Sequence, residues 1–238
     1  MRPVVPRLLL AVLLAAAALA AAAPGDDARL RALEERYRQH LLVERPDLGS
    51  RFGIERADEQ LVPLTTPSLE RDAALLAALS DSLGTIRRDA LAPARRAALD
   101  SLAAHVAFER APLLAGRWQR EAAPYAELVD SAVFDAATRR KVVACARMRR
   151  ALQRLRSVPE LLRAAEITLR AGAVTDRDTA LAHLASLQQR LRVALPALSL
   201  ACHEADRNAD LVEADTLALV ATRRFAGFLA ESRDSLPR

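Results

Sequence analysis

Apolar residues recur at spacings of three and four along nearly the whole chain after residue 26, which is the period of a helix with one buried face. The clearest stripe lies near the C-terminus and consists of Leu211, Ala214, Ala218, Ala221, Phe225 and Phe228. A second stripe consists of Leu69, Ala73, Leu76, Leu79, Leu83 and Ile86. Thr66 and Pro67 stand in front of it as an N-cap hydroxyl and a first helical residue. No window alternates as a strand requires, so the pattern predicts an all-α protein.

Proline and glycine divide this pattern into separate helices. The predicted helices cover residues 27–44, 67–86, 93–110, 124–134, 137–156, 159–171 and 176–195, and a last one carries the stripe of 211–228. Pro46, Pro112 and Gly172 end the helices before them, whereas Pro196 forces a kink or a break. The glycines and prolines of residues 47–66 predict one long irregular loop. We therefore expect a bundle of about seven to nine helices.

The N-terminus has the three parts of a secretory signal peptide. Arg2 and Arg7 give a basic start, an uncharged apolar run follows from Leu8 to Ala23, and its alanines suit peptidase cleavage. This run is shorter than the ~20 residues that span a bilayer, so we predict a cleaved signal peptide over 1–23 and no transmembrane anchor afterwards. The mature part, 24–238, suits a single α-helical domain or two tightly packed halves, located in the periplasm or outside the cell.

Composition adds two points. Aromatic residues are only 3% of the chain, so leucine, alanine and valine must build the core, which favours closely packed helices. The formal net charge is +5 and the isoelectric point is near 10.1. Lys141 is the only lysine, so the other basic residues are arginines, whose high pKa raises the isoelectric point. We interpret the arginine richness as genomic base-composition bias and predict no nucleic-acid binding.

No catalytic motif stands out. The four histidines, His40, His105, His183 and His203, are too far apart for the paired zinc ligands of a helical hydrolase, and no serine lies in a Gly-x-Ser-x-Gly elbow. One group of residues resembles a metal site, because its spacings of three and four would place all its side chains on one face of a continuous helix. It consists of His203, Asp206, Asp210 and Glu213. The alternative is a solvated acidic face paired with arginines. We predict no enzyme activity and no cofactor.

The two cysteines, Cys145 and Cys202, both lie on apolar stripes and should point inward. In an oxidising compartment they are candidates for a disulfide between neighbouring helices, and two buried free thiols are the alternative.

Between residues 139 and 156 there are eight basic residues and no acidic one. At 100° per residue, five fall within one arc opposite the Cys145 stripe: Arg139, Arg140, Arg147, Arg150 and Arg154. They form a candidate docking surface for lipid head groups or an acidic partner. The alternative is a solvated face paired with carboxylates of an adjacent helix, such as Asp72 or Glu109.

Several local patterns resemble the N-terminal half of the bacterial family known as domain of unknown function 885. They are Glu35-Arg36-Tyr37 continued through His40 to Ile54, Thr66-Pro67-Ser68, Pro124 to Leu128, Leu155 to Leu162, and Phe225 to Arg238. The resemblance implies a secreted helical fold similar to zinc metallopeptidases. The family's His-Glu-x-x-Pro-Gly-His-His motif belongs to a C-terminal half and is absent here, so no catalytic residue carries over.

Two functions remain open. The first is an exported, non-catalytic helical protein that binds a peptide-like ligand in a groove or a partner protein against one face. The second is a component of a split zinc metallopeptidase-like hydrolase, whose catalytic half is on another chain. A truncated family member without activity is the third possibility.

Overall fold

The computed structural model describes residues 25–138, 142–169, 174–202 and 205–231, and these residues contain helices and no strand. The predicted all-α fold is confirmed. Nine α-helices are described: α2 (Asp26–Val43), α3 (Pro46–Arg51), α4 (Thr66–Gly84), α5 (Pro93–Leu114), α6 (Arg117–Arg120), α7 (Ala123–Thr138), α8 (Ala144–Leu169), α9 (Arg177–Cys202) and α10 (Ala205–Glu231). Two short 3₁₀ helices, η1 (Glu55–Glu59) and η2 (Arg88–Ala90), complete the order. The predicted signal peptide lies outside the described residues.

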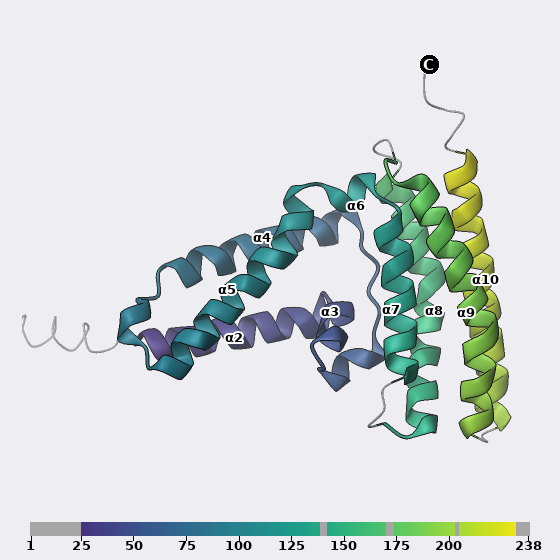
Figure 1. Ribbon diagram of the computed structural model, residues 1–238, viewed down its shortest axis with the longest axis horizontal. Coiled ribbons are helices and arrows are strands. Elements are labelled where there is room, and N and C mark those ends of the chain that lie inside the picture. Colours follow the sequence, from purple (N-terminus) through teal and green to yellow (C-terminus); the bar gives the residue numbers. More distant parts are fainter. Residues whose placement is uncertain (1–24, 139–141, 170–173, 203–204, 232–238) are drawn as a thin grey trace, which may run out of the picture.

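The molecule has two helical parts. An arm made of α2, α4 and α5 projects from a bundle made of α7, α8, α9 and α10, and α3 lies where the two meet (Figure 1). Each part has its own hydrophobic core: Leu30, Leu76 and Leu79 belong to the arm, whereas Tyr125, Leu155 and Phe225 belong to the bundle. Leu113 packs against both cores. The described residues therefore form two helical parts with separate cores that share one contact residue.

The segment predicted as a long loop, 47–66, is partly helical. It contains most of α3 and all of η1, and residues 52–54 and 60–65 are the parts without helix. A Cβ at Gly49 would lie 2.6 Å from the Leu41 carbonyl oxygen, so glycine is what lets α3 pack directly on the end of α2. Some polar residues of this segment are buried through tertiary contacts. The local pattern of apolar residues therefore did not predict this short buried helix.

Several predicted helix ends are also wrong. Pro112, Pro159 and Pro196 lie inside α5, α8 and α9. In α8 buried residues occur on both sides of Pro159, among them Val158 and Leu161. Packing on both sides therefore holds the helix together despite the backbone hydrogen bond that proline removes. The helix α4 is capped one residue earlier than predicted, by Thr65, which exchanges hydrogen bonds with Ser68 in a capping box.

No helix in the described part of the chain combines the length and the apolar character needed to cross a membrane.

Candidate functional site

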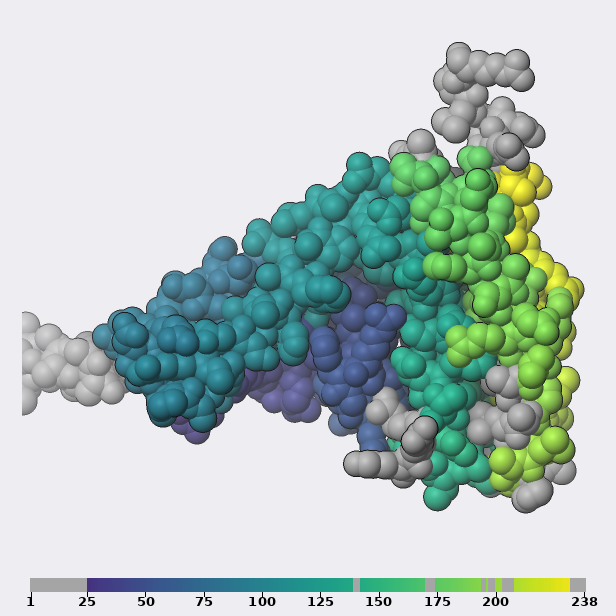
Figure 2. All heavy atoms as spheres, viewed as in Figure 1, coloured from purple at the N-terminus to yellow at the C-terminus, as the bar shows by residue number. Residues whose placement is uncertain are grey.

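A pocket of about 120 Å³ lies at the junction of the arm and the bundle. Figure 2 shows the surface hollowed in this region, where α3, the C-terminal part of α5 and α7 meet. Its wall combines apolar and charged side chains of both signs: Arg45, Asp47, Leu48, Arg51, Phe108, Glu109, Pro112, Arg117, Trp118, Pro124, Glu127 and Leu128. The lining comes from both parts of the molecule, so the sequence pattern of any one helix does not mark it.

The deep side of the pocket is built around Trp118, the only tryptophan of the chain. The Arg45 guanidinium lies 5.7 Å from the centre of the indole ring, and Tyr125 packs edge-on against it at 5.1 Å. Arg45 also donates to both Asp47 oxygens, at 3.0 and 2.9 Å. Burial opposes the Asp47 charge, but the paired guanidinium lowers the pKa of Asp47 below its usual value. Arg45 and Asp47 are therefore both charged, and their charges compensate each other.

The rim of the pocket is more exposed. Arg51 donates to the Ser131 hydroxyl at 2.9 Å and has no carboxylate within ion-pair distance among the described residues. Arg117 pairs with Glu121, one turn later on the chain, at 2.5 Å. Phe108 is 73% exposed, so its ring is available at the entrance. The rim thus offers an aromatic face and an exposed cation that makes no direct ion pair with a described carboxylate.

A buried polar cluster lies behind this pocket, inside the arm. His40 of α2 stands between two carboxylates: its Nε2 lies 3.5 Å from Glu109 of α5, and its Nδ1 lies 3.9 Å from Asp72 of α4. Tyr37 donates to the other Glu109 oxygen. Burial and the Glu109 carboxylate raise the pKa of Tyr37, so its hydroxyl stays protonated. Glu109 belongs to both the cluster and the pocket lining, which connects the two.

Sequence reasoning missed this cluster, although one signal was present. His40, Asp72 and Glu109 each occupy a buried position on an otherwise apolar stripe. A polar residue on such a stripe indicates a buried network, but only the fold brings α2, α4 and α5 together. Asp72 and Glu109 were the expected partners of the basic stretch in 139–156, and the structure places them with His40 instead.

Asp72 predicts a specific pH dependence. Burial raises its pKa to about 6, from an ordinary value near 3.8. The folded protein therefore binds a proton here that the unfolded chain releases, and the stability gained from protonation is lost as pH rises from about 4 to 6. D72N lacks this titrating group. As pH falls from 7 to 4, we therefore expect the free energy of unfolding of wild type to rise by about 2–3 kcal/mol relative to that of D72N.

Urea unfolding of both proteins across this pH range measures the effect. D100N is the matched control, because exposed Asp100 is hydrogen-bonded to Arg88 and its pKa is lowered. Its contribution has the opposite sign and is lost as pH falls. Parallel pH curves for wild type and D72N would show that Asp72 is charged throughout.

The candidate metal-ligating set of His203, Asp206, Asp210 and Glu213 is not assembled in the described part of the chain. His203 lies outside it, and no group of three or more metal-ligating side chains occurs within it. Asp210 is half-exposed and pairs with Arg156 at 3.2 Å, while Glu213 is exposed. Asp206 is part of α10. For Asp210, the alternative of a solvated acid paired with an arginine describes the structure.

The predicted anionic-surface patch is wrong for its C-terminal members. Arg154 is completely buried, and Arg150 is only 15% exposed and pairs with Asp58 at 2.9 Å. Arg147 is half-buried, whereas Arg139 and Arg140 lie outside the described residues. The physical reason is that η1 covers the side of α8 opposite the Cys145 stripe. Arg150 and Arg154 lie on the predicted helical face, but this face packs against η1 instead of meeting solvent.

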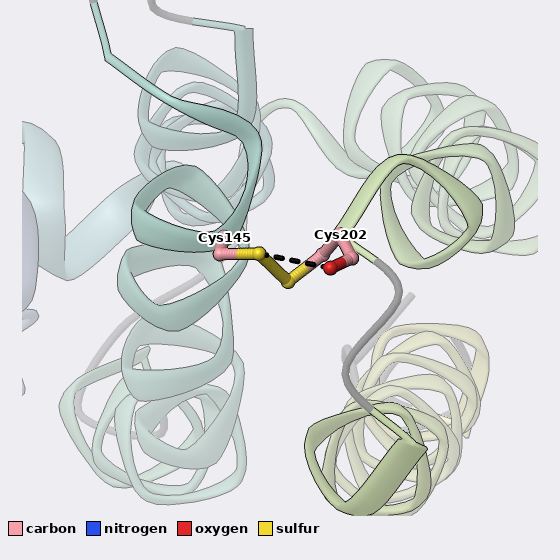
Figure 3. Close-up of a disulfide and its surroundings, with 2 residues drawn as sticks. All are labelled: Cys145 and Cys202. Carbon is pink, nitrogen blue, oxygen red and sulfur yellow. Dashed lines mark hydrogen bonds between the residues drawn. A yellow bond between two sulfur atoms is a disulfide. The ribbon is translucent and has the colours of Figure 1, made fainter.

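The two cysteines are joined in the structure. Cys145 near the start of α8 and Cys202 at the end of α9 form a disulfide with an S–S distance of 2.11 Å (Figure 3). The Cys145 sulfur also lies 3.0 Å from the Cys202 carbonyl oxygen, drawn as a dashed line. A disulfide sulfur carries no proton, so this is a close contact and donates nothing. Both side chains face the bundle core, as the apolar stripes predicted.

No protein-family model, curated protein or solved structure matches this chain. The resemblance to the family with the zinc motif therefore stays a prediction based on the short patterns quoted above.

Proposed function

We propose that the protein is an exported, non-catalytic helical module that binds a peptide-like ligand in the pocket between the arm and the bundle. The observation that carries the proposal is the composition of this pocket. Trp118, Phe108 and Leu48 give an apolar wall, and charged side chains of both signs stand beside it. A peptide segment presents the same mixture of apolar side chains and polar groups, and such mixed concave sites are typical of ligand binding.

Two features support the exported location. The first 23 residues have the pattern of a signal peptide. The Cys145–Cys202 disulfide is of a kind that persists in oxidising compartments and is rare in the cytosol. Sequencing of the N-terminus of periplasmic material is expected to start near residue 24; material that begins at Met1 would contradict the prediction of a cleaved signal.

The binding proposal predicts a change in Trp118 fluorescence when peptides are added. The indole is 8% exposed and lines the pocket, so a bound peptide alters its surroundings, and no second tryptophan obscures the signal. We expect a mixture of short peptides to change the emission in a saturable way. We expect mass spectrometry to recover the peptides intact after incubation.

F108S should weaken this binding about threefold to tenfold, because it removes the exposed ring at the entrance. L200S is the matched control: Leu200 is 75% exposed on α9 and does not line the pocket, so its loss should leave binding unchanged. An unchanged emission would refute binding in this pocket. Cleaved peptides would refute a non-catalytic role, and a co-purifying zinc-containing chain would favour the split hydrolase.

A further inference from the structure

We infer that the pocket recognises the free α-carboxylate of a peptide C-terminus. This inference rests on the proposed function and specifies which end of the ligand enters. It depends on the hydrogen-bonding groups around the pocket: three lining side chains carry donors without a protein acceptor, and among the lining carboxylates only one oxygen of Glu109 is buried without a hydrogen bond in the described part of the chain.

The unused donors come from three side chains. The Trp118 Nε1–H is buried and reaches no acceptor among the described residues. Arg45 uses Nε and Nη2 on Asp47, while its Nη1 lies 3.9 Å from the nearest Asp72 oxygen, beyond hydrogen-bond distance. Arg51 donates only to Ser131 in the described part of the chain and is otherwise exposed. A buried N–H without an acceptor destabilises the folded protein, so a ligand oxygen that accepts from the Trp118 indole is bound favourably.

The carboxylates of the lining differ in how far they are paired. Asp47 receives two hydrogen bonds from Arg45. Glu109 faces α2, where Tyr37 donates to one oxygen, and its other oxygen is buried without a hydrogen bond, 3.5 Å from His40 Nε2. Glu127 stands at the rim, 47% exposed, with His183 at 3.5 Å. Its charge is therefore screened by solvent, which weakens its repulsion of a bound anion.

The size and the wall of the pocket limit what can accompany the carboxylate. A volume of about 120 Å³ holds a carboxylate together with the first atoms of one side chain, and it is too small for a long peptide segment. Leu48, Leu128 and Pro124 line the same space, so an apolar terminal side chain fits beside the charged group. Arginine is the side chain best suited to a carboxylate, because its planar fork matches the two oxygens.

The test compares N-acetyl-Ala-Ala-Leu as the free acid and as the C-terminal amide, with Trp118 fluorescence as the readout on the mature protein. We expect the acid to bind at least tenfold more tightly than the amide. Sodium acetate should compete with the acid at millimolar concentrations, and sodium chloride at the same ionic strength should not.

R51Q should reduce the preference for the acid to less than threefold, and R51K should restore part of it, because charge is kept without the planar fork. R163Q is the matched control, since Arg163 is an exposed arginine on α8 that does not line the pocket. Equal binding of acid and amide would overturn the carboxylate inference while leaving the proposed function intact. Binding of neither peptide would count against both, and competition by chloride equal to that by acetate would reduce the effect to general screening.

Discussion

Replacement of Arg154 by alanine is expected to lower the free energy of unfolding by about 3–5 kcal/mol. The Arg154 side chain of α8 is completely buried and donates to two backbone carbonyls, that of Ala132 in α7 and that of Ala57 in η1, the latter at 2.7 Å. Its removal leaves both carbonyls without this donor and opens a cavity in the bundle core. Because η1 belongs to the chain that leads into the arm, the same change should loosen the attachment of the arm to the bundle.

Urea unfolding followed by circular dichroism measures this loss. R156A is the matched control, because Arg156 lies two residues later on the same helix but is 46% exposed and pairs with half-exposed Asp210. An exposed pair of this kind contributes less than about 1 kcal/mol. Similar losses for the two variants would mean that Arg154 is solvated and that its place in the core is wrong.

Removal of the disulfide is expected to have a comparable effect. The bond joins residues separated by 57 positions, and a closed loop of this length restricts the unfolded chain by about 4 kcal/mol in the chain-entropy account. The double variant C145A/C202A should therefore unfold at lower urea concentration than wild type. The loss should be expressed mainly in the α8 and α9 helices that the bond connects.

Reduction provides an independent test of the same bond. Dithiothreitol should lower the stability of wild type to about that of the double variant and should leave the double variant unchanged, since the chain has no other cysteine. If dithiothreitol destabilised both proteins equally, its action would be unrelated to the disulfide. A wild-type protein with two titratable thiols before reduction would contradict the pairing.

The sequence predictions were accurate where they depended on local geometry and wrong where they depended on contacts between distant segments. The stripe of Leu211, Ala218 and Phe225 predicted a buried helix face correctly, because spacings of three and four express a local geometry. The predicted break at Pro159 failed, because proline weakens a helix by an amount that packing on both sides can exceed. Local rules therefore gave the elements more reliably than their ends.

The same limit applies to the charged side chains. A helical arc placed Arg154 opposite the Cys145 stripe, but whether that side meets water or η1 is decided by a segment almost one hundred residues earlier in the chain. His40, Asp72 and Glu109 are likewise ordinary polar residues in sequence until α2, α4 and α5 pack together. Partners of a buried charge come from distant segments, so no local pattern identifies them.

For this protein the sequence alone determined the all-α class, the apolar faces of the long helices and the inward direction of both cysteines, because each depends on periodicity within one helix. Only the tertiary structure decided the arm and bundle, the pocket around Trp118, and which arginines are buried. These depend on contacts between segments far apart in the chain, where burial and electrostatic pairing select one arrangement among many that the same helices permit.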